Sequence, residues 1–316
     1  MYNEYLEFEK PIAELQAKIE ELKSSSLSDD INIIDDIEKL KGKCNKLTVS
    51  IFKNLTDHQI VQLARHQLRP HSSDYISYIF DDFQPLSGDR QKGKSMAMIS
   101  GIARIDGKSV MIVCQEKGRE TEEKIARNFG MPTPECYRES QRIIDLANKF
   151  ELPLITFIDT AGAYPGINAE KNNQSGAIAK NIYKLFELET PIVSVIIGEG
   201  GSGGALAIGV ADKLMMLQYS IFSVISPEGC ASILWKDSKK AADAAKQMNL
   251  TAEKIYQLGL IDRIITEPVG GAHRNSEQTA KFIKSAIVEE LSLLSGKSSE
   301  QIIKDRYAKY RAIGAH

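Results

Sequence analysis

The sequence predicts an α/β protein in which a helical N-terminal arm precedes a domain built on a largely parallel sheet. Two observations lead to this prediction. From about residue 95, short apolar runs alternate with helical patterns, which is typical of βαβ crossovers. Before that point, the periodicity is helical. The chain has 316 residues, of which 42% are hydrophobic, so a sizeable core is possible. We expect the arm to span residues 1–82 and the main domain, with its C-terminal helices, residues 83–316.

The arm is expected to consist of three helices that pack on the main domain or on a partner. Apolar residues at three-four-three spacing define one face of the first helix: Ile12, Leu15, Ile19 and Leu22. A second helix is expected around 31–52. A third begins at Thr56-Asp57 and runs through Leu68, where Arg69-Pro70 ends it.

The main domain is expected to begin with a β-hairpin. Met96–Arg104 and Ser109–Cys114 are strand-like runs, and Asp106-Gly107 between them is a hairpin turn signal. Strands and helices then alternate, and two helices close the chain. The expected strands are 154–158, 192–197, 214–217, 221–225 and 260–265, and the expected helices between them are 134–150, 173–188, 202–211 and 251–258.

Composition and targeting signals exclude several classes of protein. The net charge is −2, so no global field favours nucleic acid or an anionic membrane. The four cysteines form no C-x-x-C pair, and no Cys/His spacing resembles a zinc site, so no metal is expected. The N-terminus is acidic and polar, unlike a signal peptide, and no apolar run reaches the length of about 18 residues that a membrane span needs. Cytoplasm is therefore the expected compartment.

The most informative segment is a glycine cluster between a buried strand and a small-residue helix. Gly198–Gly204 holds five glycines in seven residues. A helix N-terminus offers unpaired N–H groups, and glycine permits close backbone approach. Such a segment can cradle a phosphate, stabilise an oxyanion, or simply allow tight packing. The dinucleotide-binding pattern G-x-G-x-x-G is present, but the acidic residue that should follow about 20 positions later is missing. A dinucleotide site is therefore disfavoured.

A second strand, 155–158, also runs into a glycine-rich loop, which ends at Gly166. In a parallel sheet, the loops after neighbouring strands line one crevice. An ordinary βα turn with Asp159 as a helix cap is the alternative. No G-x-S-x-G elbow is present, and the histidines lie far from the glycines in sequence, so a Ser-His mechanism is disfavoured.

These segments resemble the alpha subunits of bacterial-type acetyl-CoA carboxylase carboxyltransferases, members of the crotonase superfamily. The resemblance covers most of the chain. Its motifs are Phe157–Gly166, Gly198–Ala207, Ser223–Trp235, Gln62–His66, and Gly118–Thr121 with Asn128–Pro132. The Ser-Pro-Glu-Gly-Cys-Ala run at 226–231 is more specific than any glycine pattern. The resemblance implies a crotonase-like ββα spiral.

The resemblance also implies a reaction and partners. The family moves a carboxyl group from carboxybiotin, carried on the biotin carboxyl carrier protein, to acetyl-CoA, giving malonyl-CoA in the first committed step of fatty acid synthesis. It works as an α2β2 heterotetramer with a beta subunit, beside biotin carboxylase in the wider complex. The beta subunit carries a zinc ribbon. This chain has none, so zinc is expected only on the partner, and no cofactor is expected to be bound covalently here.

The resemblance assigns roles to particular residues. Backbone N–H groups at the helix start are expected to stabilise the biotin urea oxygen; they belong to Gly203, Gly204 and Ala205. The residues expected to shape or line the biotin and substrate site are Gly162, Tyr164, Pro165, Gly166, Gly200 and Gly201. The basic cluster Arg90, Lys92 and Lys94 could contact a CoA phosphate or lie in a solvated loop.

Two other functions stay open at this point. A stand-alone crotonase-type acyl-CoA hydratase or isomerase would need a carboxylate base, for which Glu199 or Glu228 could serve. A non-catalytic scaffold subunit would use the glycine loop only for packing.

Overall fold

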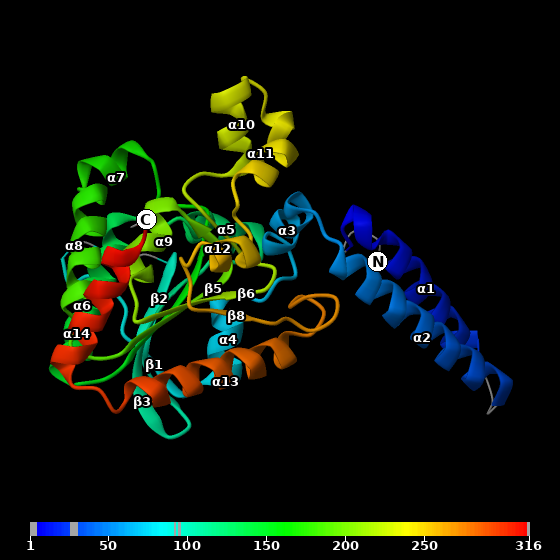
Figure 1. Ribbon diagram of the computed structural model, residues 1–316, viewed down its shortest axis with the longest axis horizontal. Coiled ribbons are helices and arrows are strands. Elements are labelled where there is room, and N and C mark those ends of the chain that lie inside the picture. The colour runs from blue at the N-terminus through cyan, green and yellow to red at the C-terminus, as the bar shows by residue number, and fades with distance from the viewer. Residues whose placement is uncertain (1–4, 26–30, 92, 94–95, 315–316) are drawn as a thin grey trace.

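A single mixed sheet forms the centre of the computed structural model, which describes residues 5–25, 31–91, 93 and 96–314 (Figure 1). Within this part of the chain the sheet has eight strands, in the order β1-β2-β3-β4-β5-β6-β8, and β7 pairs with the end of β5. The strands are β1 Asp81–Pro85, β2 Met98–Ile105, β3 Lys108–Gln115, β4 Leu154–Thr160, β5 Ile192–Gly201, β6 Lys213–Leu217, β7 Ile221–Ser223 and β8 Arg263–Ile265.

The strand directions agree with the sequence. β1, β2 and β3 pair antiparallel, whereas β3, β4, β5, β6 and β8 pair parallel. The predicted hairpin is confirmed: Asp106 and Gly107 have φ of 47° and 76°, as a two-residue turn of type I′ requires. Because neighbouring parallel strands are joined by crossover connections, the helices between them should lie on the faces of the sheet, and they do.

Helices cover both faces. On one face lie α6 Pro134–Lys149, α8 Gln174–Glu187, α9 Ser202–Gly209 and α12 Ala252–Gln257; on the other lie α4 Ser72–Ile79 and α13 Ser276–Leu294. Successive residues of β4 supply both cores: Leu154 and Ile158 face the first set of helices, and Ile155 and Phe157 the second. This two-sided burial explains why the parallel strands read as continuous apolar runs.

The N-terminal arm divides into two parts. The long helices α1 Lys10–Ser25 and α2 Ile31–Lys53 form a hairpin that points away from the sheet (Figure 1). By contrast, α3 Asp57–Ala64 and α4 pack on the sheet. The third helix ends at Ala64, so its predicted end at Leu68 is wrong. The residues after it turn toward distant partners: Arg65 pairs with Glu199 of β5, and the buried Arg69 pairs with Glu267, which follows β8. The division at residue 82 falls within β1 and stays a prediction.

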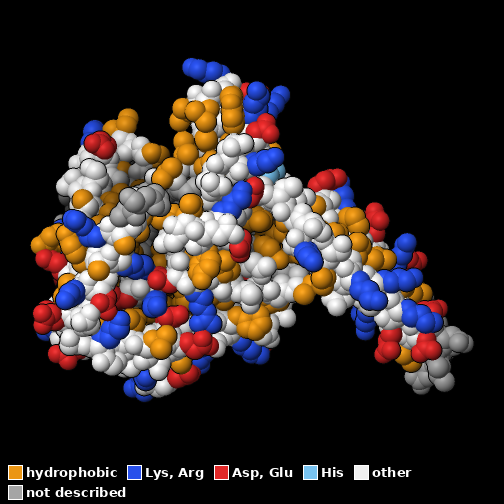
Figure 2. Space-filling view, viewed as in Figure 1, with side chains coloured by type: hydrophobic (Ala, Val, Ile, Leu, Met, Phe, Trp, Pro, Cys, Tyr) orange, Lys and Arg blue, Asp and Glu red, His pale blue; other side chains and the backbone are white. Residues whose placement is uncertain are grey.

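A small lobe stands out beside the end of β7. It consists of α10 Pro227–Trp235 and α11 Ala241–Gln247, which sequence reasoning did not assign to helices (Figure 1). Hydrophobic side chains gather on its surface (Figure 2). On α10, Ile233 is 68% and Leu234 63% accessible, and Val224, just before the lobe, is 80% accessible. The short helices α5 Thr121–Ala126 and α7 Ile167–Lys171 were also missed, since neither has enough turns to show a period.

The last helix, α14 Ser299–Ala312, is anchored by a buried arginine. Arg306 is 1% exposed and binds both carboxylate oxygens of Asp212, at 2.9 and 2.8 Å. It also donates to the carbonyls of Leu185, Leu188 and Thr190. The Asp212 carboxylate accepts from the N–H of Ile192, the first residue of β5. Both charged groups of this buried ion pair, the guanidinium and the carboxylate, therefore have hydrogen-bond partners.

Two expectations from composition can be compared with the described residues. The cysteines Cys44, Cys114, Cys136 and Cys230 form no disulfide. Among the residues described, no helix combines the length and the apolar character that crossing a membrane requires.

Candidate functional site

The glycine cluster forms a sharp turn from strand to helix. β5 continues through Gly201, so its predicted end at Ile197 is wrong; β7 pairs with Glu199–Gly201 and extends the strand. α9 then begins at once with Ser202, whose φ of 48° is unusual for a residue with a side chain. No described side chain caps the first turn of α9. The site residues Gly200 and Gly201 thus lie on the strand, and Gly203, Gly204 and Ala205 on the first turn.

The two predicted glycine segments meet in space. A Cβ on Gly204 would lie 2.6 Å from backbone atoms of Gly162 and Ala163, and one on Gly201 would collide with the backbone of Ala161. The Thr160 hydroxyl holds the same loop, donating to the carbonyl of Gly162 at 2.8 Å and accepting its N–H at 3.1 Å. Glycine is therefore required here by close packing. Whether these residues are also amide donors to a ligand stays a prediction.

The rest of the loop after β4 is held by its own backbone. Tyr164 donates its N–H to the carbonyl of Pro132 at 3.0 Å, and the Gln174 amide donates to the carbonyl of Tyr164. Pro165 is exposed, and Gly166 precedes α7. The predicted binding role of Tyr164, Pro165 and Gly166 is neither strengthened nor weakened by these bonds. Arg90 is exposed, and Lys92 and Lys94 lie outside the described residues.

A network of charged side chains joins the carboxyl ends of β3, β4 and β5. Lys117 binds Asp159 and Glu199, each at 2.7 Å. Arg65 binds Glu199 at 2.6 Å and Glu228 at 2.8 Å. Asp159 also accepts the N–H of Glu199. Asp159 therefore holds β5 and Lys117, and its interpretation as a helix cap is wrong.

The network settles the protonation of its members. Burial alone would raise the pKa of Glu199, but Lys117 and Arg65 lower it to about 2. Burial would likewise lower the pKa of Lys117, but Asp159 and Glu199 raise it above its usual value. The pKa of Glu228 is lowered as well, because Arg65 and hydrogen bonds outweigh burial. Neither glutamate is suited to act as a general base near neutral pH, where a pKa close to the working pH is needed.

Sequence reasoning missed Arg65 and Lys117 as members of this network. A signal for Lys117 existed: Gln115-Glu116-Lys117 is a polar run directly after an apolar strand, at the edge where the neighbouring strands also end. Arg65 had no such signal, since it reaches Glu199 from a helix 134 residues away in sequence.

A cavity of about 250 Å³ opens beside the network. Arg65, Lys117, Asp159 and Glu199 line it, together with residues of the turn between α3 and α4. Its lining does not include any residue of the loop after β4 or of the first turn of α9. The cavity is thus adjacent to the glycine segments without containing them.

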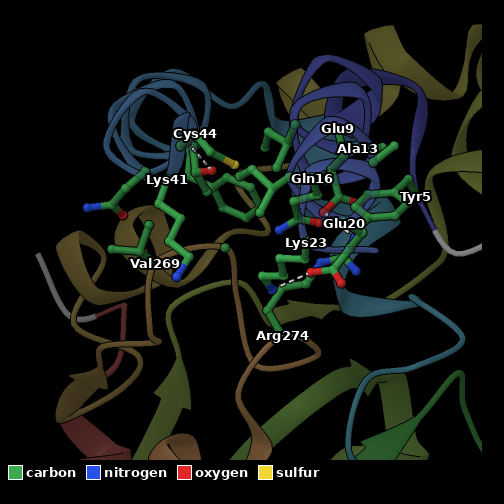
Figure 3. A pocket seen from close by; sticks show the side chains of 17 residues that line it. Tyr5, Glu9, Ala13, Gln16, Glu20, Lys23, Lys41, Cys44, Val269 and Arg274 are labelled. Atoms are coloured by element: carbon green, nitrogen blue, oxygen red, sulfur yellow. Dashed lines mark hydrogen bonds and ion pairs between the residues drawn. The ribbon is translucent and has the colours of Figure 1, made fainter. Parts of the chain in front are cut away.

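A larger cavity, of about 530 Å³, lies elsewhere, between α1, α2 and the turn at 269–274 (Figure 3). At its edge, Glu9, His66 and His273 bring three possible metal ligands within 4.8 Å of one another. Their bonds favour an ion-pair cluster instead. Arg274 binds Glu9 at 3.0 Å, and Nδ1 of His66 accepts the N–H of Leu68 at 3.1 Å, so both side chains already have partners within the protein. Because Glu9 precedes α1, its bonds to His273 and Arg274 secure the base of the arm.

Comparison with known proteins identifies the family. The family model described as "Acetyl co-enzyme A carboxylase carboxyltransferase-like" matches residues 5–314. The acetyl-coenzyme A carboxylase carboxyl transferase subunit alpha of Stenotrophomonas maltophilia K279a is 51% identical over 99% of this chain and 98% of its own length. That of Coxiella burnetii RSA 331 is 53% identical over 98% of each. The chain belongs to the acetyl-CoA carboxylase carboxyltransferase alpha-subunit family.

Several solved structures share the fold. Transcarboxylase 12S matches with a TM-score of 0.59 and 19% identity, over 71% of this chain and 41% of its own. A Pseudomonas malonate decarboxylase hetero-tetramer matches with a TM-score of 0.57 and 16% identity, over 70% and 90%. The geranyl-CoA carboxylase beta subunit of P. aeruginosa matches with a TM-score of 0.57 and 12% identity, over 77% and 46%. The predicted crotonase-like α/β fold is confirmed, and membership of the family makes the chain a carboxyltransferase subunit.

Proposed function

We propose that this chain is the alpha half of an acetyl-CoA carboxylase carboxyltransferase, and that it holds carboxybiotin while the carboxyl group moves to acetyl-CoA. The observation that supports it most is the strand-to-helix turn at Gly201–Ser202. There the amides of Gly203, Gly204 and Ala205 lie on a helix start that no described side chain caps. The curated relatives named above bear the same name as the function proposed.

The proposed reaction needs no side chain of this chain as an acid or a base. When carboxybiotin releases its carboxyl group, negative charge develops on the urea oxygen, and the α9 amides stabilise it. The positive end of the helix acts in the same direction, although α9 is short. The biotin nitrogen then removes a proton from the acetyl methyl group, and the resulting enolate attacks the carboxyl carbon. Lys117, Arg65 and their carboxylate partners hold the end of β5, from which α9 and these amides continue.

A partner subunit fits the surface beside the site. Ser223, at the end of β7, pairs with Gly201; the exposed Val224 follows it directly, and the exposed Ile233 and Leu234 lie on α10. Exposed apolar side chains that lie together are typical of interaction sites. The proposed partner is the zinc-bearing beta subunit in an α2β2 assembly, which would bind the CoA thioester. The biotin carboxyl carrier protein and biotin carboxylase would complete the complex in the cytoplasm.

The two alternative functions, a hydratase or isomerase and a scaffold subunit, agree less well with the structure. A hydratase or isomerase would use Glu199 or Glu228 as base, but both pKa values are lowered and Arg65 binds both carboxylates. A scaffold in which the glycines only pack agrees with the contacts of Gly201 and Gly204. It leaves unexplained why the neighbouring Gly203, where a Cβ would meet only Ile178 at 3.8 Å, is also glycine.

The test is reconstitution. The chain, a cognate beta subunit, biotinylated carrier protein and malonyl-CoA are mixed, and carboxyl transfer to the carrier is followed with each component omitted in turn. The proposal predicts transfer only when both subunits are present. Hydration of crotonyl-CoA by the chain alone, or a complete mixture without transfer, would refute it.

A further inference from the structure

The side chain of Gln115 connects the two halves of the proposed site. Gln115 is the last residue of β3 and is fully buried. Its Nε2 donates to the carbonyl oxygen of Gly204 at 2.7 Å, and its Oε1 accepts the N–H of Asp159 at 3.1 Å. One amide group therefore links β4 to the first turn of α9. No motif in the sequence had drawn attention to it.

The bond to Gly204 has a directional consequence. In a trans peptide the carbonyl and the following N–H lie in one plane and point in opposite directions. Because Gln115 holds the Gly204 carbonyl, it also fixes the plane of the Gly204–Ala205 peptide, and with it the first turn of α9 on which the N–H groups of Gly203 and Gly204 lie. Removing the side-chain amide would also take away the partner of the buried Asp159 N–H, so some loss of stability is expected beside the loss of orientation.

The second bond of Gln115, which accepts the N–H of Asp159, connects the first turn of α9 to the charged network. Asp159, whose N–H binds Gln115, accepts the N–H of Glu199 through its carboxylate and also binds Lys117. Gln115 thus stands between the backbone of α9 and the ion pairs that hold the end of β5. A displaced first turn would no longer meet the oxygen that becomes negative, and a misplacement of about 1 Å can cost roughly 10²-fold in rate.

We propose that Gln115 is a positioning residue for transfer: through Gly204 it aims the α9 amides at the developing oxyanion, and it does not touch substrate. This inference rests on the proposed function, since it needs an oxyanion at the first turn of α9. It adds a side chain to a site otherwise built from backbone.

Gln141 offers a matched control. It is also buried, and its Nε2 donates to a helix carbonyl, that of Ala177, at 3.1 Å. That bond joins α6 to α8 and does not reach the backbone of the glycine segments. Gln115→Met and Gln141→Met therefore remove the same kind of bond from two places, and only the first bond ends on α9.

The experiment compares both variants with the wild type in the reconstituted pair. For Gln115→Met, we expect kcat to fall about 10- to 100-fold with KM for malonyl-CoA unchanged. We also expect faster amide hydrogen exchange in a peptide spanning 199–206, and a melting temperature somewhat below that of Gln141→Met, because the Asp159 N–H loses its partner. Gln141→Met should keep the wild-type kcat and the wild-type exchange in that peptide.

Three results would overturn the role of Gln115 while the wild-type pair is active: full kcat in Gln115→Met, an equal loss of kcat in Gln141→Met, or a loss of kcat without a change in exchange at 199–206. A wild-type pair without transfer would instead refute the proposed function, and the role of Gln115 with it.

Discussion

The two ends of β5 are both held by buried ions, but in different ways. At its start, the Ile192 N–H binds Asp212, which is paired with Arg306 in a site closed to solvent. At its end, Asp159 and Lys117 bind Glu199, and here a cavity opens and the Lys117 side chain keeps 17% of its surface exposed. The closed end has no room for a ligand, whereas the open end lies next to the glycine segments.

This difference separates ion pairs that only stabilise the fold from ion pairs that lie beside the proposed site. Arg306 uses its remaining N–H groups on main-chain carbonyls, so its pair fastens α14 to the core. Lys117 and Arg65 use theirs on carboxylates of strand and helix ends around the proposed site. Mutations at the two ends should therefore separate stability from activity.

The largest expected effect is at the closed end. Arg306→Met leaves Asp212 buried without its cation, and breaking such a pair costs about 3 to 5 kcal/mol. The measurement is urea unfolding of the chain, with Arg311→Met as the control, because Arg311 lies exposed on the same helix. Equal stability of the two variants would contradict the assignment of Arg306 as the anchor of α14.

The next effect is on activity, at the open end. Gly204→Val places side-chain atoms against the backbone of Gly162 and Ala163 and moves the α9 amides away from the oxyanion. Losing one such donor costs roughly 10²- to 10³-fold in rate. Transfer in the reconstituted pair measures it. The control is Gly42→Val, because no atom outside its own helix lies within 4 Å of a Cβ at Gly42. Full activity of Gly204→Val would remove the amides from the mechanism.

A smaller effect on stability is expected for Lys117→Met. It leaves Asp159 and Glu199 close together with only Arg65 to compensate, which we expect to cost about 2 kcal/mol in the free energy of unfolding. Lys124→Met is the control, since Lys124 lines the same cavity. The double variant with Glu199→Gln should recover part of the loss, and no recovery would mean that the carboxylates do not repel each other.

The smallest effect concerns pH. The pKa of Glu199 is lowered from 4.5 to about 2, so its ion pairs stabilise the fold above about pH 4.5, and this stabilisation is lost as the pH falls toward about 2. Glu199→Gln should therefore lose less stability than the wild type between about pH 5 and pH 3. Urea unfolding at the two pH values provides the comparison. An equal loss in both proteins would show that Glu199 is not paired as described.

The sequence predicted the fold well where periodicity or a turn signal was local. Asp106-Gly107 identified the hairpin, and the apolar runs located the parallel strands. What it missed depends on distant contacts: β5 reaches Gly201 because β7 pairs with it, and the helix before Arg65 stops early because of tertiary ion pairs. The glycines of the site were visible, and a polar run after β3 pointed to Lys117. The bonds of Gln115, Lys117 and Arg65 could not be predicted, since their partners come from other strands and helices.

The most direct test is a crystal structure of the reconstituted pair with biocytin, the biotinylated lysine that stands for the carrier's prosthetic group. The account predicts that the urea oxygen lies within about 3 Å of backbone nitrogens in the segment Gly203–Ala205. A urea oxygen bound elsewhere, with that first turn bonded only to its own chain, would contradict it.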